Sequence, residues 1–300
     1  MKRGVKWTLY GLIGVVVVGG VLAGALNQIA ERKRMRVVRV DIKALALPQD
    51  GEALAQGRYL FESRGCAECH GVDGKGKVVI DDPNGLYVKA PNISQGGAIV
   101  ARYTTDDWVR VIRHGVKADG RPVLVMPSQD FSRLSDPDVG ALIAYAKSLP
   151  AATGGGAEIR LPFLVKVLYG AGVVPDAAEI IDHTLPPEAA VAVGPTVEHG
   201  RYVANMCVGC HGQGLSGGKI PGAPPDWPPA SNLTPGAGTA LARYASAENL
   251  RAMFRTGRRP DGSAVSTVMP FESLRAMNDI DVEALYKYLK TLAPRPAGGR

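Results

Sequence analysis

The sequence of 300 residues predicts an all-α fold, in which one apolar N-terminal helix is followed by two copies of a helical domain. Three observations lead to this prediction. Residues 7–26 form an uncharged apolar run. The remainder contains an internal repeat whose unit is roughly 100 residues long, a usual domain size. Each copy of the repeat contains one Cys-x-x-Cys-His motif.

The apolar run is long enough to cross a membrane. Twenty helical residues rise about 30 Å, which matches the hydrocarbon core of a bilayer. We therefore assign residues 1–30 to an N-terminal membrane anchor and residues 31–50 to a linker. A cleaved signal peptide, with a processing site near Ala23-Gly24-Ala25, is the alternative. Either interpretation exports the rest of the chain.

The net charge of +7 is concentrated beside the anchor, because residues 1–50 carry nine basic and three acidic side chains. Lysines and arginines at that place can contact lipid headgroups. We therefore expect the membrane, and no nucleic acid, as the partner of these charges. Basic residues after the helix would by themselves favour a cytoplasmic body.

Two further segments complete the predicted organisation. Residues 51–150 form the first domain and residues 196–296 the second, with an interdomain linker at 151–195. The matches between the copies run from the start of each domain to its end: Gly57-Arg58-Tyr59 with Gly200-Arg201-Tyr202, Val125-Met126-Pro127 with Val268-Met269-Pro270, and Asp138-Val139 with Asp281-Val282.

Each copy predicts three main helices. The first leads into the cysteine motif, over residues 53–62 and 198–206. The second spans 105–114 and 247–256, with Thr104 and Ser246 as N-caps. The closing helices run from Pro137 to Leu149 and from Asp279 to Leu292. The segments between motif and second helix are rich in Gly, Pro and Asn, as loops are.

The Cys-x-x-Cys-His spacing is typical of covalent haem attachment. Cys66 and Cys69, like Cys207 and Cys210, would form thioethers to a haem c, and His70 and His211 would ligate the two irons. The alternatives are disulfides or a zinc site. The motifs use all four cysteines of the chain, so none is left to complete a cysteine-rich zinc site.

Met126 and Met269 are the candidates for the second axial ligands. They occupy equivalent places in the repeat, and a proline follows each. The other internal methionines are interpreted as core residues: Met35, Met206, Met253 and Met277. A thioether ligand raises the reduction potential and fills the sixth coordination position, which suits electron transfer rather than catalysis.

On these residues each unit resembles the class I c-type cytochrome domain. The resemblance implies that a helix ahead of the haem motif crosses the closing helix, near Gly57, Phe61 and Tyr145, and near Gly200 and Tyr288. The pair of units is similar to the multihaem cytochrome c subunits of membrane-bound alcohol, gluconate and aldehyde dehydrogenases. Those subunits commonly carry three haem motifs, whereas this chain has two.

The resemblance implies a bacterial cytoplasmic membrane protein with its haem domains facing the periplasm, where c-type haem is attached. We expect it to relay single electrons without being an enzyme. Its redox partners would be a dehydrogenase subunit, a quinol-oxidising complex or an oxidase. The alternatives are a dihaem peroxidase, which needs one haem with an open sixth position, and an integral dihaem subunit of a terminal oxidase.

Three smaller expectations concern the remaining residues. The apolar stretch Leu161 to Leu168 is expected to pack between the domains, with a membrane- or partner-contacting helix as the alternative. His114 and His199 are expected at the surface or at helix ends. Four arginines are expected to form either a solvated face or a patch for an acidic redox partner: Arg251, Arg255, Arg258 and Arg259.

Overall fold

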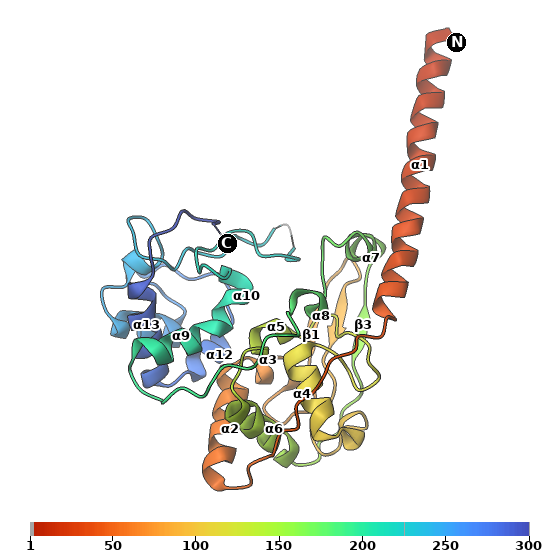
Figure 1. Ribbon diagram of the computed structural model, residues 1–300. Coiled ribbons are helices and arrows are strands. Elements are labelled where there is room, and N and C mark those ends of the chain that lie inside the picture. Colours follow the sequence, from red (N-terminus) through yellow and green to blue (C-terminus); the bar gives the residue numbers. More distant parts are fainter. Residues whose placement is uncertain (1–2, 225, 300) are drawn as a thin grey trace.

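The computed structural model describes residues 3–224 and 226–299. It is mostly helical, as predicted, with one small sheet of three strands. Figure 1 shows helix α1 (Arg3–Arg34) projecting from a body made of two units that lie side by side. The first unit is coloured orange to yellow and the second green to blue.

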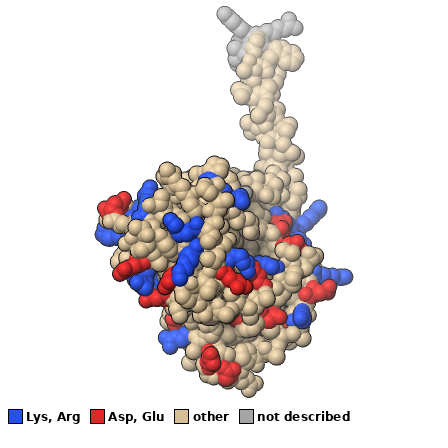
Figure 2. Space-filling view, turned by 60° about the vertical axis from the view of Figure 1, so that its left-hand side comes forward, with Lys and Arg blue, Asp and Glu red and all other residues tan. Residues whose placement is uncertain are grey.

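Helix α1 is exposed along its apolar part. Val15 and Val16, for example, are each 72% exposed. Within the described residues, α1 is the one helix long and apolar enough to cross a membrane, and a signal sequence would pass the same test. Figure 2 shows most of this helix as an uncharged stalk above a body that carries charges of both signs.

The first unit contains three short helices that were not predicted and the three predicted helices, which are α2 (Gly51–Ser63), α4 (Thr105–His114) and α6 (Asp136–Ser148). Asp50 caps α2 by accepting a hydrogen bond from the Ala53 amide. Thr104 caps α4 with a full capping box, as expected from the sequence. The short helices are α3 (Cys66–His70), η1 (Val100–Arg102) and α5 (Ser128–Phe131).

A small antiparallel sheet lies beside this unit, where the sequence predicted only loops. Its order is β1 (Val78–Asp81), β2 (Tyr87–Lys89) and β3 (Glu158–Arg160). The strand β3 comes from the interdomain linker. Strands this short leave too little alternation in the sequence to be recognised.

The second unit repeats the helices of the first. Ser246 caps its middle helix, as predicted. The elements are α9 (Val197–Ala204), η2 (Asn205–Cys207), α10 (Val208–His211), η3 (Leu241–Arg243), α11 (Ala247–Thr256), α12 (Phe271–Ala276) and α13 (Asp279–Thr291).

The predicted helix crossing is confirmed in both units. Helix α2 packs on α6, and α9 packs on α13. A Cβ atom at Gly57 would overlap the Ala141 carbonyl, and one at Gly200 would overlap the Ala284 carbonyl. Glycine is therefore required where the backbones touch. In the first unit the Phe61 and Tyr145 rings meet edge to face at this point.

The expectation for Leu161 to Leu168 was wrong. This stretch belongs to α7 (Phe163–Gly170), which packs against the lower part of α1 and not between the domains. Gly170 lies so close to α1 that a Cβ atom would overlap the Leu26 carbonyl. The other helix of the linker, α8 (Ala177–Ile180), packs on α5.

Some of the expectations for the methionines and histidines are confirmed, and others were wrong. Met253 and Met277 are buried in the second core and Met206 packs against it, but Met35 is 48% exposed at the end of α1. His114 ends α4, as expected. His199 lies in the first turn of α9, so the helix-end expectation holds, but it is 4% exposed and bonded to Asp281 of α13, so the surface expectation was wrong. The sequence pattern did not reveal this contact.

Candidate haem sites and the contact between them

The two cysteine motifs form equivalent short helices. Helix α3 holds Cys66 and Cys69 one turn apart, on the same side, and ends at His70. In the second unit η2 and α10 place Cys207, Cys210 and His211 in the same order. No disulfide joins any of the four cysteines, all of which lie in the described ranges, and this rules out the disulfide alternative.

The buried thiols lie in apolar surroundings. Burial raises the pKa of the Cys66 thiol to about 12, and burial likewise raises the pKa of Cys207 to about 12. These raised pKa values favour the neutral thiol form, whereas zinc binds thiolates. Cys66 and Cys207 also pack against the apolar core of their own units, and apolar surroundings of this kind suit a porphyrin.

Each motif histidine is fixed by a backbone carbonyl. The Nδ1 atom of His70 lies 3.0 Å from the Pro91 oxygen, and that of His211 lies 2.7 Å from the Ser231 oxygen. Since a carbonyl can only accept, Nδ1 carries the proton and Nε2 keeps its lone pair. This is the arrangement that a metal-bound imidazole usually has. Burial also lowers the pKa of His70, which keeps the ring neutral.

Glycines bring the carbonyl loops close to the motifs. Gly76 donates to the His70 carbonyl, and Gly217 donates to the His211 carbonyl. Cβ atoms there would overlap the Ala90 and Ala230 carbonyls, respectively. The sequence analysis did not identify these glycines as part of the haem sites. They could have been found there, because Gly76 and Gly217 each lie six residues after the motif histidine.

Met126 and Met269 occupy equivalent positions in the two units. Each precedes the proline that begins a short helix, α5 or α12. Each is partly buried and packs against the core of its own unit. The structure thus places a thioether in the same part of both domains, and the ligand role of each remains a prediction.

An unpartnered buried donor in the first unit also fits a haem. Trp108 is 5% exposed, and its Nε1 atom has no hydrogen-bond partner within the described residues. A buried N–H of this kind is costly unless an acceptor is bound. A haem c carries carboxylates that can accept it. The corresponding residue of the second unit is Leu250, which has no donor to satisfy.

The domains contact each other through a reciprocal pair of hydrogen bonds. Tyr59 of the first unit donates to Asp281 of the second at 2.7 Å. Tyr202 of the second donates to Asp138 of the first at 2.5 Å. Each tyrosine oxygen also accepts from the backbone N–H of the residue that caps the other unit's closing helix, Asn278 and Ser135.

This reciprocal contact obeys an approximate two-fold relation, because the residues involved form three pairs of equivalent positions in the repeat: Tyr59 and Tyr202, Asp281 and Asp138, and Asn278 and Ser135. It also involves the haem-bearing segments. Helix α12, which follows Met269, packs on α2 and α3, and α5, which follows Met126, packs on η2 and α10. The methionine side of each unit therefore lies against the cysteine motif of the other.

Charge breaks the symmetry of the contact. Asp281 is 2% exposed and bonds to Arg64 at 2.7 Å and to His199 at 2.8 Å. Asp138 accepts a hydrogen bond from Gln56, which occupies the position equivalent to His199. Asp138 has no cationic partner in the described part of the chain. Burial acts to raise the pKa of Asp281, but Arg64, Tyr59 and His199 outweigh it and lower that pKa.

Fold and sites together define a c-type cytochrome with two haem domains. Comparison with known families agrees: residues 52–145 match the family described as "Cytochrome C oxidase, cbb3-type, subunit III", and residues 197–293 match the family "Cytochrome c". The chain is thus a dihaem cytochrome c that carries two covalently bound haem c groups.

Among curated proteins the chain is similar to cytochrome c subunits of dehydrogenases. It is 28% identical to the gluconate 2-dehydrogenase cytochrome c subunit of Pantoea cypripedii, over 85% of this chain and 63% of the relative. It is 28% identical to the cytochrome c subunit of the alcohol dehydrogenase (quinone) of Gluconobacter oxydans, over 85% and 58%. The chain therefore spans about three fifths of the length of these relatives.

A shorter similarity concerns an oxidase subunit. The chain is 30% identical to the Cbb3-type cytochrome c oxidase subunit CcoP of Helicobacter pylori over 113 residues, which are 37% of this chain and 33% of that protein. The two dehydrogenase relatives described above are named as cytochrome c subunits and not as catalytic subunits. An electron-transfer role without catalysis is therefore supported.

Proposed function

We propose that the chain is a membrane-anchored electron relay that serves a periplasmic dehydrogenase. Its haem domains face the periplasm, and α1 holds them at the cytoplasmic membrane. The observation that carries the proposal is the matched pair of sites in direct contact, each with a fixed histidine and an equivalent methionine. A relay needs two such centres held at constant separation.

The protein residues have separate tasks in this proposal. Cys66, Cys69, Cys207 and Cys210 hold the haems, His70 and Met126 ligate the first iron, and His211 and Met269 ligate the second. When bound, haem supplies an iron that changes oxidation state by one electron. The carbonyls of Pro91 and Ser231 keep each imidazole in one orientation, so that little rearrangement accompanies redox change.

The contact between the domains governs electron transfer from one haem to the other. Tyr59 and Tyr202 tie each domain to the closing helix of the other, and Asp281 with Arg64 adds a buried ion pair. These bonds hold the two domains, and with them the haems that they would carry, in a fixed relative position. Electrons can then pass within the chain without a diffusive encounter.

The proposal is tested by purification and by reduction. The full-length protein should co-purify in detergent with a flavin- or quinone-dependent dehydrogenase of the same membrane. Adding that enzyme's substrate should reduce both haems of the chain. Isolation without a dehydrogenase, together with no reduction by any periplasmic dehydrogenase fraction, would reject it.

The match of the first domain to a cbb3-type oxidase subunit favours a second candidate, an integral subunit of a terminal oxidase. The same purification separates the two. An oxidase partner would bring haem-copper subunits and oxygen consumption with it, whereas a dehydrogenase partner would bring substrate-dependent haem reduction. Quinol-oxidising partners would be recognised by inhibition of haem reduction when quinol is removed.

A further inference from the structure

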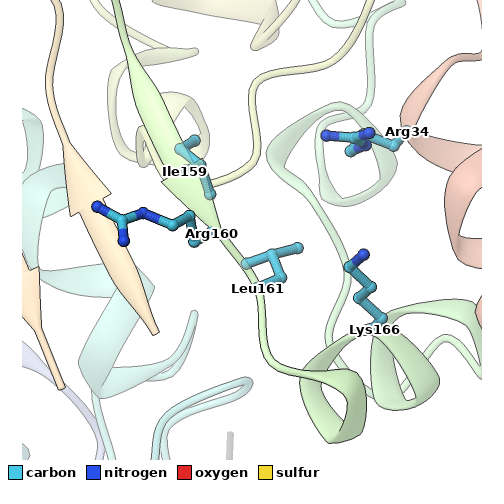
Figure 3. A pocket seen from close by; sticks show the side chains of 5 residues that line it. All are labelled: Arg34, Ile159, Arg160, Leu161 and Lys166. Carbon is cyan, nitrogen blue, oxygen red and sulfur yellow. The ribbon is translucent and has the colours of Figure 1, made fainter. Parts of the chain in front are cut away.

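A hollow of about 320 Å³ lies where α1 meets the body. Figure 3 shows its lining, which comes from three segments that are far apart in the sequence: the end of α1, the strand β3 and the helix α7. The lining residues are Arg34, Ile159, Arg160, Leu161 and Lys166.

The hollow carries excess positive charge. Arg34 and Lys166 both contact one carboxylate, Glu31, at 2.7 and 3.1 Å. Two cations therefore share one anion, and neither has another ion-pair partner among the described residues. Arg160 is engaged elsewhere, because it pairs with Glu158 and stacks on the Tyr87 ring, 4.2 Å from its centroid.

The opposite wall contains the apolar side chains of Ile159 and Leu161 beside Arg160. Figure 3 shows Leu161 extending from β3 toward the side where Arg34 and Lys166 lie. At the start of α7, Phe163 and Leu164 are 58% and 66% exposed. A site with cations on one wall and apolar groups on the other suits an amphiphile better than a small inorganic anion.

The position of the hollow relative to α1 agrees with this chemistry. Arg34 follows Leu26, the last residue of the apolar run, by about 12 Å of helix rise. The polar zone of a bilayer extends about 5–8 Å beyond the hydrocarbon core, and long basic side chains reach several ångströms back toward it. Gly170 packs at Leu26, so α7 lies at the depth where headgroups begin.

We propose that this hollow binds the phosphate of an anionic phospholipid of the bilayer that α1 spans. Arg34 and Lys166 hold the phosphate, and Ile159 and Leu161 contact the glycerol and upper acyl carbons. The inference rests on the membrane anchoring in the proposed function. A lipid held there would also tie the body to the membrane beside α1.

The test uses full-length holoprotein in detergent, titrated with phosphatidylglycerol or phosphatidylcholine and observed by native mass spectrometry. The tightest site should prefer phosphatidylglycerol. The double variant Arg34→Gln/Lys166→Gln should lose that preference, at about five-fold in affinity for each cation. Glu31→Gln should strengthen it, because the competing carboxylate is gone. The matched control is Arg58→Gln on α2, which removes an arginine paired with Glu62 and should have no effect.

Two further arms separate the possible failures. All variants should float with neutral phosphatidylcholine vesicles; a wild-type chain that does not float would contradict the membrane anchor itself. A chain that floats but binds both lipids equally, or whose preference survives the double substitution, would overturn the lipid site alone. Displacement of phosphatidylglycerol by millimolar inorganic phosphate would show a free-anion site and would likewise overturn it.

Discussion

The two haem domains share one scaffold but differ where they touch. Asp281 of the second domain is buried with Arg64 and His199, whereas the equivalent Asp138 has Gln56 and no cation in the described structure. Glu68 of the first cysteine motif accepts a hydrogen bond from Ser273 of the second domain. At the equivalent place, Asp130 of the first domain lies against Gly209 of the second cysteine motif. Duplication supplied the symmetric contact, and substitutions then placed charge on one side of it.

The asymmetry extends to the interior of the two domains. In the first domain the Nε1 atom of Trp108 has no hydrogen-bond partner among the described residues, whereas the equivalent residue of the second domain is Leu250. The expected arginine patch is also divided: Arg251 and Arg255 pair with Asp279, while Arg258 and Arg259 bond to carbonyls of their own turn. The two haems can therefore have different potentials even if the predicted histidine and methionine ligands are the same in both domains. Residues 196–300 carry twelve basic and eight acidic side chains, and this positive excess would raise the potential of the second haem.

The largest expected effect is the loss of a sixth ligand. Met126→Ala and Met269→Ala should each lower the potential of one haem by on the order of 200 mV, because axial ligands span about 0.8 V. Each should also open that iron to carbon monoxide. Redox titration with optical spectra measures both changes.

Each of these variants is the control for the other, since only the haem of the altered domain should respond. Unchanged potentials and no carbon monoxide binding in either variant would show that the methionines are not ligands. Peroxide-dependent oxidation of a reduced cytochrome by the wild-type protein would instead favour the peroxidase alternative.

The next effect compares the two interface carboxylates. Asp281→Asn should lower the free energy of unfolding by about 3 kcal/mol, because it leaves the buried Arg64 without its counter-charge. Asp138→Asn should cost about 1 kcal/mol, the value of an ordinary hydrogen bond. Denaturant unfolding of the two holoproteins measures the difference. Equal losses would mean that the ion pair adds nothing to the interface.

The tyrosines sharpen the same comparison. Tyr202→Phe leaves Asp138 with one partner and the buried Ser135 amide with none, so we expect a loss of about 2 kcal/mol. Tyr59→Phe leaves Asp281 with Arg64 and His199, and it frees the Asn278 amide, which is only partly buried and made a longer bond of 3.2 Å, so we expect about 1 kcal/mol. Chemical denaturation again gives the values. A larger loss for Tyr59→Phe would reverse the asymmetry argued above.

The smallest effect concerns Asp130 and pH. Burial against the second domain raises the pKa of this carboxyl from 3.8 to about 7. The folded protein then binds a proton that the unfolded chain releases, so this group makes stability fall as pH rises from about 4 to about 7. Asp130→Asn should remove that part of the pH dependence. The effect of Asp281 on stability has the opposite sign. Its pKa is lowered in the folded protein, so the stability that it contributes is lost as pH falls.

Thermal unfolding of wild type and Asp130→Asn between pH 4 and pH 8 tests this. Parallel curves for the two proteins would show that Asp130 does not titrate in this range.

The sequence predicted what is local or repeated. Cys-x-x-Cys-His, Met-Pro, the capping residues Thr104 and Ser246, and the crossing glycines each recur at a fixed spacing, so one copy checks the other. The sequence could not predict the contact between Tyr59 and Asp281, which are 222 residues apart. It also misplaced α7, because apolar periodicity shows that a helix face is covered but not what covers it.

The central claim is that the two haems form one relay held by the reciprocal tyrosine–aspartate contact. The most direct test is to reduce a fraction of the haems rapidly and to follow electron redistribution between the two domains at several protein concentrations. We predict a rate that is independent of concentration in the wild type and that falls in the double variant Asp138→Asn/Asp281→Asn. A redistribution rate that rises in proportion to protein concentration would contradict the account.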